Sequence, residues 1–196
     1  AEGLPALGIS DLMNGFGLVK FFKACRGAGI KPVIGADVRM ENPDRPDTPF
    51  RALLLVKNHN GYLRLSELLT RAFTCQEEGC LPQLKQAWLG EGGNEGLICL
   101  SGAHYGEVGL NLMNGHEAAA EAAAEKYAAL FPNAFYLELQ RLPEKPEWER
   151  SVAGSTALAR KLNLPVVATH PTQFLEPDDF LAHEARVCIA EGWTLA

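Results

Sequence analysis

The sequence predicts an α/β fold in which a parallel sheet is either rolled into a barrel or laid out as a doubly wound layer. Short apolar segments typical of strands alternate with longer segments of helical periodicity along the chain. Two strand-like segments flank one helix near the amino terminus, which is the arrangement of a right-handed crossover. Two apolar strands, ending near Asp37 and at Thr169 before His170, run directly into polar residues, as strands do at the mouth of a barrel enzyme.

The first half of the chain contains three predicted strands and two predicted helices. Phe16, Val19 and Phe22 recur at helical spacing in the first helix, which ends before two glycines. The connector over 41–49 is rich in proline and too short for a helical crossover, so we expect the strands on either side of it to form a hairpin. The expected elements are strands over 5–10, 32–40 and 51–57 and helices over 15–26 and 62–73.

The second half continues the alternation. The segment 117–130 is rich in Ala and Glu, which favour a helix by intrinsic propensity, and Tyr127 gives it an apolar anchor. Asp178 or Asp179 is expected to cap the last helix, because an Asp oxygen can accept hydrogen bonds from the free amides of a first turn. The expected elements are strands over 97–100, 135–139 and 166–169 and helices over 117–130, 148–162 and 180–190.

Composition limits the class of protein. A chain of 196 residues with 47% hydrophobic residues is long enough for one sizeable core. Its net charge of -6 and its scattered Lys and Arg residues argue against a surface dedicated to phosphate backbones. There is neither a signal peptide nor a long apolar run, so we expect a cytoplasmic protein without a membrane segment. Because the chain begins without Met, we expect it to be a fragment of a longer protein.

The five cysteines suit a reducing compartment. Cys25, Cys99 and Cys188 lie in apolar periodic segments, which predicts buried thiols. Cys75 and Cys80 lack two further ligands nearby, so a zinc site there is not expected.

Polar residues that follow the predicted strands form the candidate site. In a parallel barrel they would meet at one mouth, where carboxylates and imidazoles could hold a metal with a free position for water. The same residue types also cap helices and satisfy loop backbone, and the chain has no HxH, HExxH or paired CxxC motif. The candidates are Asp11, Asp37, His104, His170 and Gln173, with Ser10, Ser101, Glu138 and Gln140 at neighbouring strand ends.

Eight short sequence runs give further information about the family of this chain. They occur in order over nearly the whole chain, at 7–11, 15–21, 29–37, 60–65, 96–102, 135–141, 165–169 and 178–183. Together they resemble the amino-terminal PHP (polymerase and histidinol phosphatase) domain of bacterial DNA polymerase III alpha subunits. The resemblance implies a distorted (β/α)7 barrel, incomplete at its amino-terminal strand, with residues 1–196 as a single PHP domain. It also implies a parent DNA-directed DNA polymerase that uses magnesium, with its palm, thumb and fingers outside this chain.

The resemblance implies, in addition, which positions would hold metals in active PHP domains. Asp37 matches a bridging glutamate and is one methylene shorter. Leu and Pro offer no donor electrons and Gln is a poor ligand, so we expect no bound metal, no cofactor and no catalytic residue in this segment. Asp11, Asp37, His104, His170 and Gln173 would then line a vestigial cleft, although Asp37 with the two histidines could still form one mononuclear site. The remaining ligand positions are occupied by Leu12, Ala103, Leu142, Pro171 and Gln173.

Two functions of different class follow from the resemblance. The favoured one is a scaffold that supports the polymerase core and docks the proofreading exonuclease subunit, with DNA bound only through the full-length parent. Trp88 and Trp148 could anchor such a surface, but we expect each to cover the domain's own core. The alternative is an active metal-dependent phosphoesterase of the PHP superfamily, motivated by the acidic and histidine residues that remain. An unrelated amidohydrolase-like barrel would need a metal-bridging Lys in a strand, and Lys31 precedes its strand.

Overall fold

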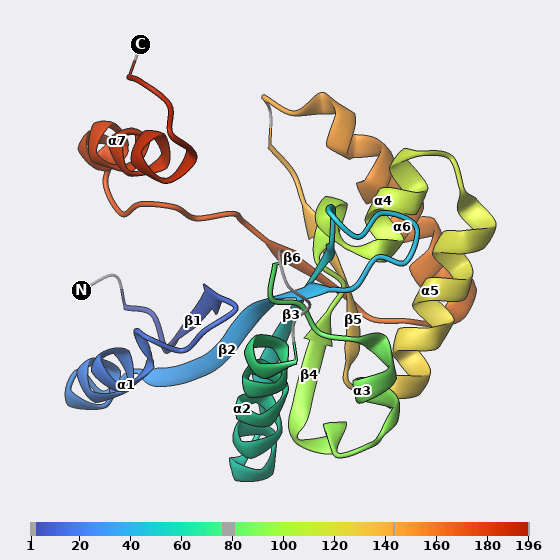
Figure 1. The fold of residues 1–196 in the computed structure, drawn as a ribbon, viewed down its shortest axis with the longest axis horizontal. Helices are drawn as coiled ribbons and strands as arrows, with labels where there is room; N and C mark the ends of the chain where they lie inside the picture. Colours follow the sequence, from blue (N-terminus) through green and yellow to red (C-terminus); the bar gives the residue numbers. More distant parts are fainter. Residues whose placement is uncertain (1–2, 76–80, 143, 196) are drawn as a thin grey trace.

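The computed structural model describes residues 3–75, 81–142 and 144–195, and these form one curved sheet with helices packed around it (Figure 1). The sheet order is β1-β2-β3-β4-β5-β6. The strands are β1 (Ala6–Leu12), β2 (Lys31–Met40), β3 (Phe50–Val56), β4 (Leu97–Leu100), β5 (Phe135–Gln140) and β6 (Val166–Thr169). The helices are α1 (Leu18–Gly27), α2 (His59–Thr74), α3 (Gln86–Gly90), α4 (Glu107–Met113), α5 (Glu117–Leu130), α6 (Glu149–Leu162) and α7 (Phe180–Glu191).

The strand directions follow from the connections. Helix α1 joins β1 to β2, and these strands are parallel, as the predicted crossover requires. The connector over 41–49 makes β2 and β3 antiparallel, which confirms the predicted hairpin. Strand β3 is also antiparallel to β4, whereas β4, β5 and β6 are parallel to one another. Within the described residues β1 and β6 lie at opposite edges and do not pair, so the sheet is an incomplete distorted barrel.

The core lies against the middle of the sheet. Alternation along β2 places Ala36, Val38 and Met40 in the core and turns Asp37 and Arg39 to the other face. The helices that cover this core each contribute an apolar stripe. The buried side chains on these helices include Leu65 and Leu68 of α2, Ala120, Ala124 and Tyr127 of α5, and Leu158 of α6.

One close backbone contact fixes α2 against the sheet. A Cβ on Gly61 would lie 1.8 Å from the carbonyl oxygen of Gly96, at the entry to β4. The side chain of Asn58 accepts a hydrogen bond from the Gly61 amide at 3.0 Å and thereby caps the helix. Helix α2 therefore begins at His59, three residues before the predicted start, because the cap is Asn58 and the turn residues after it are already helical.

Other elements also differ from the predictions. Strand β1 continues to Leu12, because its parallel register with β2 extends to the pair Leu12 and Asp37. Helix α1 begins at Leu18 and not at residue 15, since Gly15 and Gly17 form a turn in which the Leu18 amide donates to Gly15 O at 3.1 Å. Helices α3 and α4 were not predicted, because each has only five to seven residues and no side-chain cap.

Two side-chain predictions in the carboxyl-terminal region were wrong. Asp179 occupies the N-cap position of α7, but its side chain makes no capping hydrogen bond to that helix; its carboxylate instead accepts a hydrogen bond from the Glu176 amide at 3.0 Å and closes the short turn before the helix. Cys188 is half-buried, because α7 buries none of its residues. Cys25 and Cys99 are buried as predicted, and Cys80 lies outside the described residues.

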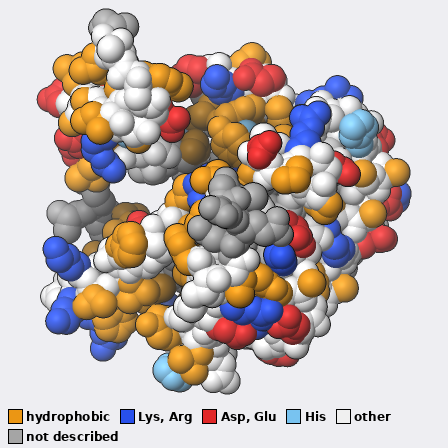
Figure 2. Space-filling model, in the orientation of Figure 1, with side chains coloured by type: hydrophobic (Ala, Val, Ile, Leu, Met, Phe, Trp, Pro, Cys, Tyr) orange, Lys and Arg blue, Asp and Glu red, His pale blue; other side chains and the backbone are white. Residues whose placement is uncertain are grey.

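Apolar side chains remain exposed at both ends of the sheet. Phe16 next to α1 is 90% exposed, and Leu181 and Ile189 of α7 are 71% and 82% exposed. Figure 2 shows hydrophobic side chains gathered over the lobe that contains α7. None of the described helices is long and apolar enough to span a bilayer.

Candidate functional site

The polar residues at the strand ends meet in a cavity of about 290 Å³ at one end of the sheet. Strand β3 runs antiparallel to its neighbours, so its first residues lie beside the last residues of the parallel strands. The cavity contains three of the five predicted residues, Asp37, His170 and Gln173. Other polar residues that line it are Ser10, Arg51, Tyr105, Glu138, Gln140, Thr169 and Thr172.

Asp37 is bound by an arginine that faces it across the hairpin. Arg51 Nε donates to Asp37 Oδ1 at 2.8 Å, and Arg51 Nη2 donates to Asp37 Oδ2, so both carboxylate oxygens are engaged. The β2–β3 register pairs Asp37 with Leu53, which makes Arg51 its diagonal neighbour on the same face. The hydrogen bonds to Asp37 raise the pKa of Arg51, so this cation stays charged.

Glu138 is the second carboxylate of the cavity and has only neutral donors. Thr169 Oγ1 donates to its Oε1 at 2.5 Å, Gln140 Nε2 donates to the same oxygen at 3.2 Å, and the Gly102 amide donates to Oε2 at 3.1 Å. Burial raises the pKa of Glu138, and these hydrogen bonds oppose the increase. The carboxylate thus joins the end of β5 to β6 and to the turn after β4.

His104 does not reach the cavity. It follows β4 in a short 3-10 turn and packs between Tyr105 and Trp148, with ring centroids 4.0 Å and 3.3 Å away. Neither ring nitrogen has a partner among the described residues, and burial lowers the pKa of His104 to about 4. It is therefore a neutral core ring at physiological pH, while His170 is exposed at the cavity mouth.

Asp11 has a local structural role. Its Oδ2 accepts a hydrogen bond from the Gly17 amide at 3.1 Å, which holds the loop between β1 and α1. The structure does not bring Asp11 into the cavity: Ser10 lines it, and successive side chains of a strand point to opposite faces. Trp88 is buried in the core and Trp148 covers His104, as expected for residues that pack against their own domain.

The two carboxylates that line the cavity already have hydrogen-bond partners. Both oxygens of Asp37 are held by Arg51, Glu138 is held by three neutral donors, and His170 is the one imidazole among the described residues that line the cavity. Within the described ranges no three His, Cys, Asp or Glu side chains are grouped to hold a metal ion. The arrangement instead cross-links neighbouring strands.

Sequence reasoning missed Arg51 and Thr169 as cavity residues. Arg51 is the single charged residue in the otherwise apolar segment 50–56, and a charge at such a position indicates a nearby partner. Arg51 pairs with Arg39, which lies two residues from Asp37 on β2. This pairing identifies Asp37 as the partner of Arg51, but it is known only from the structure. Thr169 ends β6 and carried no separate signal.

Comparison with known proteins identifies relatives of the whole chain. The PHP domain family matches residues 1–142. The chain is 70% identical over 194 residues to the DNA polymerase III subunit alpha of Neisseria meningitidis serogroup A / serotype 4A, covering 98% of this chain and 17% of that protein. It is 46% identical over 194 residues to the subunit alpha of Pseudomonas fluorescens, covering 98% of this chain and 16% of that protein. It is 40% identical over 195 residues to the subunit alpha of Escherichia coli K12, covering 100% of this chain and 17% of that protein. The chain thus spans about one sixth of the length of these curated relatives.

Proposed function

Since this chain belongs to the PHP domain family, we propose that it is the amino-terminal PHP domain of a cytoplasmic bacterial replicative DNA polymerase. In this proposal it supports the polymerase core and docks the proofreading exonuclease subunit, and its own cleft is not catalytic. Template-directed DNA synthesis, with magnesium, belongs to the remainder of the alpha subunit, through which DNA is bound. The relatives named DNA polymerase III subunit alpha, at 40–70% identity, support this assignment.

The paired Arg51 and Asp37 carry the inference that the cleft has lost its metals. A divalent cation about 4 Å from a guanidinium would be repelled by about 8 kcal/mol at an effective dielectric constant of 20. The bidentate hydrogen bonds also occupy the carboxylate oxygens that a metal would need. The cleft therefore serves better as a set of strand cross-links than as a metal centre.

The cross-links explain why such a cleft would be useful in a scaffold. Arg51 joins β3 to β2 through Asp37, and Glu138 joins β5 to β6 and to Gly102. A binding platform needs strands held at fixed positions, and hydrogen bonds to charged groups are among the stronger polar contacts in a fold. This role requires no metal and no turnover at the cleft.

The test uses the full-length subunit that contains this segment and the variant Asp37→Asn. We expect wild-type protein to extend a primer, to contain no stoichiometric zinc or manganese, and to leave a chromogenic phosphate ester intact. Asp37→Asn should lower the free energy of unfolding by about 1–2 kcal/mol without changing primer extension by the folded protein. Glu121→Gln is the matched control, because its partner Lys161 is mostly exposed and the expected loss is below about 0.5 kcal/mol.

Other results would contradict the proposed function. Tight uptake of two or three ions per chain, or ester hydrolysis that Asp37→Asn abolishes at unchanged stability, would show an active metal site. A full-length protein that does not extend primers would refute the polymerase assignment.

A further inference from the structure

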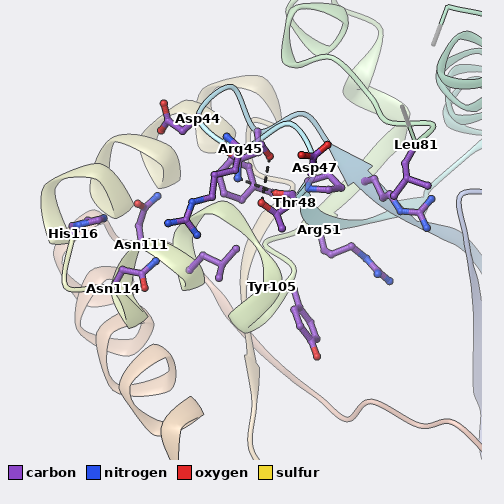
Figure 3. Close-up of a pocket in the computed structure, with 15 residues that line it drawn as sticks. Asp44, Arg45, Asp47, Thr48, Arg51, Leu81, Tyr105, Asn111, Asn114 and His116 are labelled. Atoms are coloured by element: carbon purple, nitrogen blue, oxygen red, sulfur yellow. Dashed lines mark hydrogen bonds between the residues drawn. The ribbon is translucent and has the colours of Figure 1, made fainter. Parts of the chain in front are cut away.

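A second and larger hollow lies on the outer side of the β2–β3 hairpin. It has a volume of about 610 Å³ and lies between the connector over 41–49 and helix α4 with the turn that follows it (Figure 3). We call it the connector groove, and the lining residues used below are Arg39, Arg45, Phe50, Leu110, Asn111 and Asn114. Arg51 and Tyr105 line both this groove and the cleft described above, whereas Asp37 and Glu138 line only the cleft.

Both walls of the connector groove are fixed by internal hydrogen bonds. In the connector, buried Asn42 donates from Nδ2 to Thr48 O at 2.9 Å and accepts from the Arg45 amide at 3.3 Å. On the opposite wall, Asn111 Nδ2 donates to Glu107 O at 2.8 Å, and the His116 amide donates to Asn111 O at 2.8 Å. A hollow with walls that are already ordered loses little conformational entropy when a ligand enters.

Two arginines that lack an ion-pair partner among the described residues bring positive charge to the groove. Arg39 is paired in register with Arg51, and like charges placed directly opposite each other destabilise a sheet. Asp37 binds Arg51, so Arg39 has no ion-pair partner among the residues the structure describes, and neither has Arg45. In Figure 3 the Arg45 side chain extends across the groove toward Asn111, while Asp44 points away from it.

The space between the charges is partly apolar. Half-buried Phe50 and Leu110 line the groove together with the amide side chains of Asn111 and Asn114. An extended peptide can place carboxylates opposite the two arginines and an apolar side chain between them. A nucleic-acid strand carries a phosphate on every nucleotide, whereas a peptide can place uncharged residues beside Asp44 and Asp47, which also line the groove.

We propose that the connector groove docks an extended acidic segment of a partner protein, with its carboxylates on Arg39 and Arg45 and an apolar side chain against Phe50 and Leu110. The proposal rests on the docking role proposed above and adds the face and the chemistry of the contact. It predicts an interaction that weakens with salt, since the arginines lie at a solvent-accessible groove.

The test measures the binding of the proofreading exonuclease subunit of the same bacterium to the full-length alpha subunit. Arg45→Glu should weaken binding about tenfold or more and reduce its salt dependence, whereas Arg45→Lys should retain most of the affinity. Asn114→Asp, which adds a negative charge to the opposite wall, should weaken binding in the same direction. The control is Arg26→Glu, an exposed arginine of α1 outside the groove, which should bind as wild type does. Thermal unfolding of each variant establishes that it is folded.

The possible results distinguish the proposed role of the connector groove from the docking role of the whole domain. Wild-type affinity in folded Arg45→Glu and Asn114→Asp would overturn the groove assignment and leave the docking role intact. A wild-type subunit that does not bind the exonuclease would instead remove the docking role itself. If Arg45→Glu binds the exonuclease normally but loses affinity for single-stranded DNA, the occupant is a nucleic acid and the proposal is wrong.

Discussion

The centre of the sheet and its two ends are built from similarly apolar elements, but only the centre is buried. Leu54 of β3 and Leu137 of β5 are completely buried, whereas Leu181 of α7 is 71% exposed. The central strands have helices α2, α5 and α6 against them, while α7 buries no residue (Figure 1). An apolar stripe therefore shows which face of an element can be covered, and a neighbouring element decides whether it is covered.

The largest expected difference in stability between the two regions comes from substitutions of two glycines. Gly61→Ala should lower the free energy of unfolding by about 4 kcal/mol or more, because its Cβ would force the Gly61 and Gly96 backbones apart. Gly27→Ala at the end of α1 meets no atom within 4 Å and should be neutral or slightly stabilising. Chemical denaturation of both variants measures the difference, and equal stabilities would show that α2 can move away from β4 at little cost.

A smaller effect is expected from removing one leucine in each region. Leu137→Ala should cost about 3 kcal/mol, because it leaves a cavity in the closed core. Leu181→Ala should change stability by less than about 0.5 kcal/mol, since its side chain is mostly in contact with solvent. The same denaturation curves provide the measurement. A comparable loss of stability in Leu181→Ala would mean that Leu181 is buried in solution by a contact outside the described residues.

The third test concerns His104, a buried polar residue that follows β4. The unfolded chain binds a proton at His104 near pH 6.5, but the folded chain does so only near pH 4, so stability is lost as the pH falls through this window. His104→Phe should remove this loss, which is at most about 2 kcal/mol at pH 5. Burial raises the pKa of Glu138, which acts in the opposite sense and is common to both proteins. Thermal midpoints from pH 7 to pH 4 provide the comparison, and parallel curves would mean that His104 is hydrated.

Much of the fold could be predicted because its signals are local. Strands β4 and β6 and helix α5 have the predicted bounds, and the short proline-rich connector correctly predicted the hairpin. The short helices α3 and α4 escaped detection because five to seven residues give too few turns for a periodic pattern. Helix α4 packs against α5 and α6, and α3 buries Trp88 and Leu89 in the core.

The site was predicted less completely, for a different reason. Asp37, His170 and Gln173 share one cavity because strand ends gather at one side of a sheet, which the alternation of elements already implied. Asp11 and His104 are absent from it, since one binds its own loop and the other stacks on Trp148, a residue 44 positions later in the chain. Such contacts depend on the path of a loop and have no counterpart in local sequence.

The sequence by itself determined the alternation of strands and helices, the hairpin and the resemblance to PHP domains, because residue spacing and short motifs depend only on neighbours along the chain. The tertiary structure alone decided that Arg51 binds Asp37, that His104 is a core ring, and that Arg39 and Arg45 line a groove without an ion-pair partner among the described residues. These outcomes depend on strand register and loop packing, which bring together residues far apart in the chain.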